Sequence, residues 1–261
     1  MSTASLDRRA RVLCLSGHDP GGGAGIHADL EAVAAQGAHA LTVITALTAQ
    51  DSVDVRQVWP VASARLAEQL ELLLADGAIA AIKIGLLGDA TQIAVIVDAI
   101  RRSGAPVVCD PVLRAGGGRD LSDAATIAAL LDELLPHVDL LTPNAAEARR
   151  LSGCNDPFEA AAALRARGCR QVLVTGGDEA EAEVHNRWLD AEGRAHEFRW
   201  PRLPARFHGA GCTLAAAIAA RRALGEDWAT AVEAGQRYTQ QALAGAYRAG
   251  RGRLIPRRSG R

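Results

Sequence analysis

The hexapeptide His208-Gly-Ala-Gly-Cys-Thr213 opens an alanine-rich stretch with helical character. Successive backbone N–H groups of a Gly-x-Gly turn at a helix N-terminus form an anion site, which can stabilise charge on a transferred phosphoryl group. The same helix terminus should lower the pKa of Cys212, whose thiolate could then accept a proton from a substrate hydroxyl. The candidate catalytic residues are therefore Gly209, Ala210, Gly211 and Cys212. The alternative interpretation is a small buried cysteine beside a glycine that packs the helix.

Oxygen-bearing side chains follow two predicted strands. Asp110 ends a buried strand, at the edge where open α/β sheets bind ligands. Thr142-Pro-Asn-Ala-Ala-Glu147 follows the next strand and places Asn144 and Glu147 on one face of a helix start. Carboxylate and amide oxygens suit Mg²⁺, so these three residues are candidates for a magnesium and phosphate site. The alternative for Asn144 and Glu147 is a capping box that only stabilises the helix.

A glycine-rich loop, Gly17–Gly25, lies between the first predicted strand and helix. Glycine allows close approach of the backbone to a ligand, and the helix start offers free N–H groups. The loop is neither a GxxxxGK[ST] nor a clean GxGxxG motif, so a turn chosen for its geometry is the alternative. Asp29 follows in the first helix, either as a hydrogen-bond acceptor for a ligand or as a partner of the helix dipole.

The composition is that of an ordinary globular protein. The chain has 261 residues, 23% of them charged, and a formal net charge of −1, which excludes long disorder and gives no field to attract nucleic acid. Its five cysteines lack CxxC spacing, which argues against a disulfide framework and a structural zinc site. The N-terminus lacks a signal-peptide pattern and no uncharged apolar run reaches about 18 residues, so we expect a cytoplasmic protein without a membrane partner.

One residue type is almost absent from the chain. Among 29 lysine and arginine residues, Lys83 is the single lysine. Lysine offers a compact point charge where arginine offers a planar fork, so a lysine in an arginine-rich chain indicates a site that needs an ammonium group. Chance survival of one lysine is the alternative.

Short apolar strands alternate with amphipathic helices along the chain. We predict strands at 12–16, 40–46, 53–59, 81–85, 106–110, 139–142 and 171–175, and a hairpin of 183–190 with 195–200. We predict helices at 26–36, 62–74, 90–102, 122–134 (capped by Ser122), 145–152, 157–167, 211–224 and 228–249. The alternation indicates an α/β fold whose mainly parallel sheet is covered on both faces. We expect one domain over residues 11–250 and flexible tails at 1–10 and 251–261.

Six segments together resemble the hydroxymethylpyrimidine/phosphomethylpyrimidine kinases of thiamine biosynthesis, members of the ribokinase-like superfamily. In chain order they read SGHDPGGGAGIHADL, VITALTAQD, IKIGLLG, VVCDPVL, LLTPNAAEARRL and HGAGCTLAAAIAA. The resemblance covers about residues 11–250 and implies a ribokinase-like three-layer αβα sandwich. It also implies ATP and Mg²⁺ as cofactors, a homodimer, and phosphorylation of 4-amino-5-hydroxymethyl-2-methylpyrimidine, followed by a second phosphorylation to the diphosphate.

The resemblance implies roles for single residues. Asp29 and Gln50 would hydrogen-bond the aminopyrimidine, Gly17 would pack against its ring, and Lys83 would neutralise charge near the site. Cys212 would be the base, and the backbone of residues 209–212 would be the anion hole. The residues implied for the nucleotide are Asp110, Asn144, Glu147, Thr175 and Gly177, with Asp110 and Glu147 also holding Mg²⁺.

The chain departs from the family pattern on the phosphate side. Thr175-Gly-Gly-Asp178 stands where the family usually reads KGGH, so a lysine that would face the ATP phosphates is absent. Arg114 and Arg119, in the loop after Asp110, are candidate replacements, and Ala210 stands where threonine is usual. We therefore expect a retained pyrimidine site, with the second phosphorylation the less secure step.

Other functions share this pattern. Pyridoxal and pyridoxine kinases have the same fold and the cysteine variant occurs among them, although Gln50 together with Asp29 favours an aminopyrimidine. Sugar and nucleoside kinases usually carry aspartate where Cys212 stands. A kinase-like sensor that binds the pyrimidine without turnover is the alternative outside the enzymes.

Overall fold

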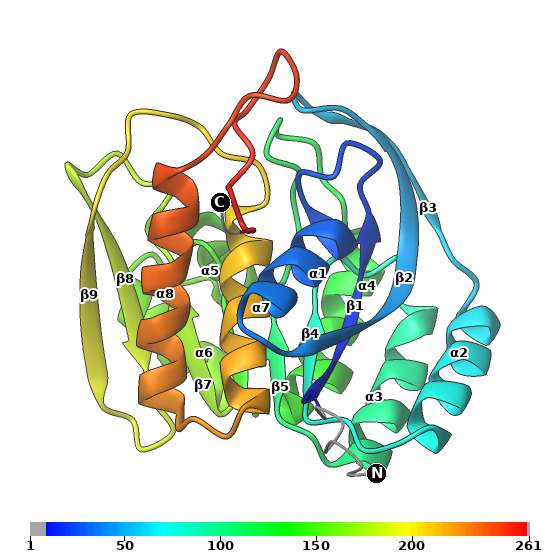
Figure 1. Ribbon diagram of the computed structural model, residues 1–261. Coiled ribbons are helices and arrows are strands. Elements are labelled where there is room, and N and C mark those ends of the chain that lie inside the picture. Colours follow the sequence, from blue (N-terminus) through cyan, green and yellow to red (C-terminus); the bar gives the residue numbers. More distant parts are fainter. Residues whose placement is uncertain (1–8, 260–261) are drawn as a thin grey trace, which may run out of the picture.

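A mainly parallel sheet forms the centre of the molecule (Figure 1). Within residues 9–259, which the computed structural model describes, it has nine strands in the order β3-β2-β1-β4-β5-β6-β7-β8-β9. Strands β2 to β7 in this order run parallel, whereas β3 at one edge and β8 and β9 at the other pair antiparallel. The strands are β1 (Arg11–His18), β2 (His39–Gln50), β3 (Val55–Pro60), β4 (Ala81–Ile84), β5 (Val107–Cys109), β6 (Leu140–Leu141), β7 (Gln171–Val174), β8 (Glu183–Leu189) and β9 (Ala195–Pro201).

Helices cover both faces of the sheet, which confirms the expected three-layer sandwich. One face carries α1 (Gly25–Ala35), α7 (Ala210–Ala223) and α8 (Trp228–Ala244). The other face carries α2 (Ser63–Ala75), α3 (Thr91–Ser103), α4 (Ala124–Ala129) with the turns Leu130–Leu134 and Leu135–His137, α5 (Ala145–Ser152) and α6 (Pro157–Ala166). Within residues 9–259 no helix is both long and apolar enough to cross a membrane.

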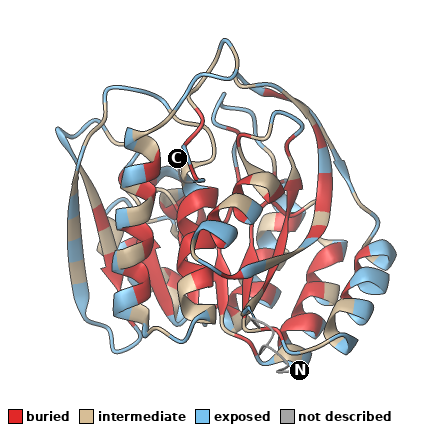
Figure 2. Ribbon diagram, in the orientation of Figure 1, coloured by how far each residue is buried: buried red, intermediate tan, exposed pale blue. Residues whose placement is uncertain are grey.

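Strand β1 shows why the sheet is buried on both sides (Figure 2). Leu13 and Leu15 pack with the α2, α3, α5 and α6 layer, whereas Val12 and Cys14 pack with the α1, α7 and α8 layer. Successive side chains of a strand point to opposite faces, so a strand covered by helices on both sides is apolar at nearly every position. Polar side chains are therefore found where the strands end, at the edge of the sheet that can bind a ligand. The middles of the strands are apolar.

Several predicted element ends differ from the structure, and three of the differences have a clear physical cause. Strand β2 continues to Gln50 because it pairs with β3 as far as Val55, which carries Gln50 to the edge of the sheet. The prediction that Ser122 caps a helix is wrong: the carboxylate of Asp123 accepts the N–H of Thr126 at 2.8 Å. The last predicted helix ends at Ala244 and not at residue 249, because the chain turns at that point to meet the C-terminal segment.

The C-terminal residues 251–259 were expected to form a flexible tail, but they pack back onto the molecule. Leu254 forms a bridge with Phe207, and Ile255 forms one with Tyr247. These backbone hydrogen bonds hold the segment beside the hexapeptide that begins α7. The expected tail residues 1–8 and 260–261 lie outside the described residues.

Arg258 anchors this segment and is only 2% exposed. Its guanidinium donates to Thr213 Oγ1 at 2.8 Å and to the carbonyl oxygen of Gly23 at 2.5 Å, and lies 3.2 Å from a carboxylate oxygen of Glu31. A buried guanidinium is stable only when its donors are matched, so these partners explain why a basic segment packs here and does not extend into water. Arg258 thus joins the glycine-rich loop to the start of α7.

We expect Arg258→Ala to lower the free energy of unfolding by about 2–4 kcal/mol, because the carbonyl of Gly23 and the hydroxyl of Thr213 lose a buried donor. Urea unfolding followed by circular dichroism measures the change. Arg257→Ala is the matched control, since Arg257 is exposed and adjacent in sequence; it should cost under about 1 kcal/mol. Equal losses for the two variants would contradict the anchoring role of Arg258.

Candidate active site

A pocket of about 260 Å³ opens where the carboxyl ends of the parallel strands meet the starts of α1, α5 and α7. Parallel sheets bind ligands at this edge because strand ends and helix N-termini converge there. The pocket brings together most residues that the sequence marked: Gly17, Gln50, Asp110, Asn144, Glu147, Thr175, Gly177, Gly209, Ala210, Gly211 and Cys212. Asp29 and Lys83 do not line it.

Two helices present free N-termini to this pocket. Neither α1 nor α7 has a side-chain N-cap or an acidic residue in its first turn, whereas α5 is capped by Asn144. The α7 turn depends on Gly209, which has a φ of +81°, and a Cβ there would lie 2.1 Å from the carbonyl oxygen of Gly23. The uncapped N–H groups and the positive end of the helix dipole make the start of α7 suited to a phosphate oxygen.

Asp19 connects the two glycine-containing loops. Its carboxylate accepts the backbone N–H groups of Gly21, Gly23 and Ala24 at 2.8–3.0 Å, and lies 2.9 Å from His208 Nε2. Burial opposes ionisation, but the contact with His208 and the backbone N–H groups lower the pKa of Asp19 below its ordinary value. In the sequence, Asp19 is marked only as one residue of the glycine-rich loop. Its place in the Gly17-His-Asp-Pro20 turn is the signal that could have identified it as a structural partner of the loop.

Cys212 lies at the bottom of the pocket with its thiol buried. Burial raises the pKa of Cys212 to about 12; Asp110 and Asp29 add to the rise, while Lys83 and a hydrogen bond from the N–H of Gly25 oppose it. The expectation that the helix terminus alone would lower this pKa is therefore wrong, because desolvation of the thiolate outweighs the dipole. The resting group is a neutral thiol that donates to the Asp110 carboxylate.

Two carboxyl groups share the floor of the pocket. Burial raises the pKa of Asp110 to about 6, and the Lys83 ammonium limits the rise. Burial, followed by the charge of Asp110, raises the pKa of Glu147 to about 8. Such a pair is costly to ionise without a cation, so it fits a divalent metal with water and phosphate oxygens as the remaining ligands. Within residues 9–259 no group of three or more His, Cys, Asp or Glu side chains could hold a metal by itself.

Both interpretations of the Asn144 and Glu147 pair are compatible with the structure. The side chain of Asn144 accepts the N–H of Glu147 at 2.8 Å, and Glu147 accepts the N–H of Asn144 at 3.0 Å, which is a capping box. The second oxygen of Glu147 accepts the N–H of Leu113 at 3.1 Å. Both side chains still line the pocket, so the cap holds them in position for a ligand.

Asp29 and Lys83 lie beneath the pocket and form a buried ion pair. Both side chains are 0% exposed, and Lys83 Nζ lies 2.8 Å from Asp29 and 2.8 Å from Ser16 Oγ. Burial alone would lower the pKa of Lys83, but Asp29, Cys212 and Asp110 raise it above its ordinary value. Neither side chain lines the pocket, and the charge of each is balanced by the other. Of the two expected pyrimidine contacts, Gln50 lines the pocket and Asp29 does not.

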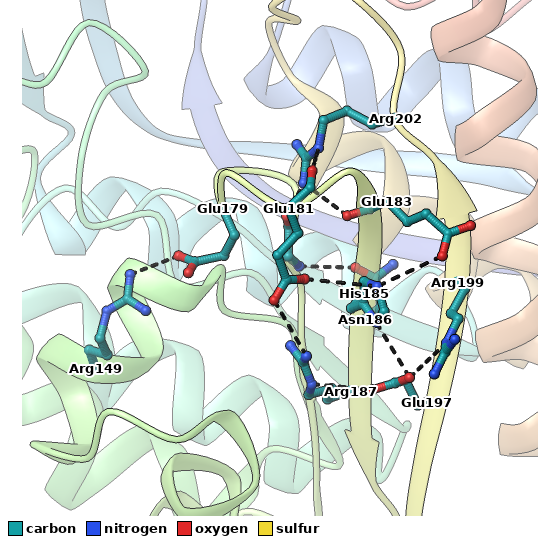
Figure 3. Close-up of polar contacts among 11 residues, drawn as sticks. Arg149, Glu179, Glu181, Glu183, His185, Asn186, Arg187, Glu197, Arg199 and Arg202 are labelled. Atoms are coloured by element: carbon teal, nitrogen blue, oxygen red, sulfur yellow. Dashed lines mark hydrogen bonds and ion pairs between the residues drawn. The ribbon is translucent and has the colours of Figure 1, made fainter.

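The turn Thr175–Asp178, which lacks the expected lysine, is held by Arg202, which directly follows β9. Figure 3 shows Arg202 beside the start of β8, where it also donates to the carbonyl oxygen of Glu183 at 3.2 Å. Arg202 donates to the carbonyl oxygens of Gly176 and Gly177 at 3.1 and 2.9 Å. Asn186 in β8 accepts the N–H of Gly176 at 3.1 Å. These bonds fix the backbone of the turn, which brings Thr175 and Gly177 to the pocket without a lysine side chain.

The arginines of the loop after β5 are already engaged. Arg114 pairs with Asp120 at 3.2 Å, and Arg119 donates to the carbonyl oxygen of Arg56. Arg114 nevertheless lines the pocket, whereas Arg119 does not, so Arg114 keeps its place as a candidate for the missing charge. Arg253 also lines the pocket, from the C-terminal segment, where no sequence motif marked it.

Comparison with known proteins shows the family of the chain. The chain matches the family model described as phosphomethylpyrimidine kinase over residues 19–256. It is 38% identical over 251 residues to a hydroxymethylpyrimidine/phosphomethylpyrimidine kinase of Rhizobium meliloti, with 92% of each chain covered.

Two solved structures show the same fold. A Bacillus subtilis pyridoxal kinase in complex with ADP superimposes with a TM-score of 0.88 at 28% identity, covering 96% of this chain and 98% of that one. A phosphomethylpyrimidine kinase of Clostridium difficile gives a TM-score of 0.79 at 27% identity, covering 90% of this chain and 100% of that one. The motifs, the fold and the extent of these matches lead to one assignment: the chain belongs to the phosphomethylpyrimidine kinase family.

Proposed function

We propose that this protein transfers the terminal phosphate of ATP to the hydroxymethyl group of 4-amino-5-hydroxymethyl-2-methylpyrimidine and then phosphorylates the monophosphate to the diphosphate. The observation that carries the proposal is one pocket lined both by Gln50 and by the free N-terminus of α7 with Cys212. Gln50 can recognise a ring, and the start of α7 can bind the phosphate that is transferred. The family relatives named for this activity support the same substrate.

The pyrimidine would lie between Gly17 and Gln50. A Cβ on Gly17 would lie 2.8 Å from Leu86 Cδ2, so the glycine lets Leu86 pack closely, and the two residues together line the pocket where a flat ring would lie. The Gln50 amide has both a donor and an acceptor, which match an exocyclic amine and an adjacent ring nitrogen. Since Asp29 is buried, it would act on the substrate through the position of α1 and not by contact.

The phosphates would lie between α7 and α5. The backbone N–H groups of residues 209–212 would bind the oxygens of the transferred phosphate, and Asn144, Thr175 and Gly177 would contact the rest of the nucleotide. Asp110 and Glu147 would hold Mg²⁺, whose charge offsets that of the phosphates. Phosphoryl transfer needs alignment and neutralised charge more than covalent catalysis, which suits a site built from helix ends.

Cys212 would take the proton of the substrate hydroxyl as the new P–O bond forms. Its thiol is neutral at rest, partly because the charge of Asp110 opposes ionisation. With a cation held by Asp110 and Glu147 that opposition disappears, while Lys83 and the N–H of Gly25 continue to favour the thiolate. The thiol would release its proton to solvent only in the loaded enzyme. The thiolate would then accept the hydroxyl proton as the substrate oxygen bonds to the terminal phosphorus of ATP and ADP leaves.

The proposal includes a cytoplasmic role in thiamine biosynthesis and a homodimer. The dimer is supported by Leu47 and Trp59, which pair across β2 and β3 and are 47% and 51% exposed. An apolar pair on an exposed ribbon is a common feature of subunit contacts.

Pyridoxal kinase is the second candidate function, favoured by the TM-score of 0.88 to a protein with that name. A sensor that binds the pyrimidine without turnover is weaker, because both carboxylates and Cys212 face the pocket.

Product analysis distinguishes these functions. Purified protein is incubated with Mg²⁺ and ATP and either the hydroxymethylpyrimidine or pyridoxal, and products are followed by mass. We expect pyrimidine monophosphate and then diphosphate, because one pocket holds the ring and the anion site. Pyridoxal phosphate as the only product would assign the second candidate, and pyrimidine binding without any product would assign the sensor.

Replacing the cysteine at the start of α7 tests the base. We expect Cys212→Ala to lower kcat by about 100-fold or more while the Kd for the pyrimidine stays nearly unchanged, because a general base acts only during the reaction. Steady-state kinetics and calorimetric binding measure the two quantities. Cys154→Ala is the control, since Cys154 lies outside the pocket. A Cys212→Ala enzyme with normal kcat would remove the thiol from the mechanism.

Glu147→Gln tests the buried carboxylate pair. With a folded-state pKa of about 8, Glu147 keeps its proton in the folded protein while the unfolded chain loses it from about pH 4.5. The free energy of unfolding therefore falls as pH rises from about 5 to 8, because the unfolded chain releases this proton and the folded protein does not. Glutamine has no proton to release, so the variant lacks this fall. Without metal, the melting temperature of the variant minus that of the wild type should increase between pH 5.5 and 8.5.

The exposed Glu159 supplies the control variant, Glu159→Gln, whose melting temperature should follow that of the wild type at both pH values. Addition of Mg²⁺ and ATP should reduce the difference for Glu147→Gln at pH 8.5 by stabilising the ionised pair of the wild type. A difference that is independent of pH would show that Glu147 ionises normally in the folded protein.

A further inference from the structure

Arg253 brings a positive charge to the pocket from outside the family motifs. It lines the pocket and is half-buried, and its backbone N–H donates to the carbonyl oxygen of Ser52 at 2.9 Å. A Cβ built on Gly116 would overlap its guanidinium, so the side chain packs directly on the backbone of the loop after β5. Two separate segments, the end of β2 and this loop, therefore fix where the guanidinium lies.

The guanidinium of Arg253 has no partner of its own. Within residues 9–259 it makes no hydrogen bond and no carboxylate lies within ion-pair distance of it. Burial lowers the pKa of Arg253, and the surrounding charges of Asp54, Arg206 and Asp178 act on it only through space. Most other arginines near the pocket are engaged, as Arg114 is with Asp120 and Arg258 with Glu31. A partly desolvated cation with five unused donors is a site for an anion.

The chemistry of the guanidinium and the position of Arg253 in the pocket indicate which class of anion it would bind. A guanidinium binds a phosphate through paired N–H donors, and phosphates are the anions that this enzyme class handles. Gly252 N–H also bonds to Ser52 Oγ at 2.9 Å, so Arg253 is attached to the β2 end, two residues beyond Gln50. The proposed nucleotide side of the pocket is lined instead by Asn144, the N-cap of α5, and by Thr175, which directly follows β7.

We propose that Arg253 binds the phosphate group of the pyrimidine monophosphate and so determines the second phosphorylation. This inference rests on the proposed function and gives Arg253 a role distinct from that of the absent lysine at position 175, which would face the ATP phosphates. In the first phosphorylation the substrate has a hydroxyl and no phosphate, so Arg253 contributes little. In the second, the substrate phosphate lies between the guanidinium and the start of α7.

The test compares the two steps in Arg253→Gln, Arg253→Lys and the control Arg251→Gln. Arg251 belongs to the same segment but is exposed and pairs with Asp51 at 3.2 Å. Initial rates are measured with the hydroxymethylpyrimidine and, separately, with its monophosphate, each over a range of ATP concentrations. We expect Arg253→Gln to raise the KM for the monophosphate about tenfold or more, with KM values for the hydroxymethylpyrimidine and ATP within about twofold of wild type.

Arg253→Lys should give an intermediate increase because it keeps the charge and loses the paired donors, and Arg251→Gln should behave as wild type. Calorimetric binding of the monophosphate without nucleotide should weaken in Arg253→Gln by the same factor as its KM. An increase in the KM for ATP in both steps would overturn the proposal by assigning Arg253 to the nucleotide. Unchanged kinetics and binding would overturn it entirely.

These outcomes are separable from a failure of the proposed function. A wild-type protein that phosphorylates neither pyrimidine contradicts the function itself, before any variant is compared. A wild-type protein that carries out both steps, with an Arg253→Gln variant that does the same, contradicts only the role of Arg253.

Discussion

The site depends on a lysine that has no contact with water. Lys83 is 0% exposed, and its charge is balanced by Asp29 on α1, with Ser16 on β1 as a further partner. A buried ammonium without an ionised partner would be strongly destabilising, so β1, β4 and α1 must keep one relative position. That position sets where α1 begins, and Gly25 at its start donates to the thiol of Cys212.

The charge of Lys83 also acts on the acidic groups that line the pocket. Lys83 favours the ionised forms of Asp110 and Cys212, whereas burial favours their neutral forms. Burial therefore raises the pKa of the acidic groups in the pocket. Of its two buried carboxyl groups, Glu147 has the higher pKa, about 8, and Asp110 the lower, about 6. Such a site ionises most easily when a cation binds. In the proposed mechanism, binding of metal and nucleotide would therefore be linked to ionisation of the Cys212 thiol.

The phosphate side shows how a family fold tolerates a changed residue. The turn at Thr175 keeps its backbone shape because Arg202 bonds to the carbonyl oxygens of Gly176 and Gly177. Arg258 similarly joins the glycine-rich loop to the start of α7 from the end of the chain. In both places an arginine holds backbone groups that bind or surround the ligand. Backbone geometry is therefore preserved while side-chain charge is supplied from elsewhere.

The sequence by itself determined the alternation of strands and helices, the class of the fold and the family, because apolar periodicity and short motifs are local properties. It also marked Gln50, Asp110, Glu147 and Cys212, which follow strands or begin helices at one edge. Only the tertiary structure decided which charges meet: Asp29 pairs with a lysine 54 positions away, and the C-terminal arginines Arg251 and Arg258 reach loops 200 and 235 positions away. Burial and partner distance set ionisation and availability, and neither is encoded in neighbouring residues.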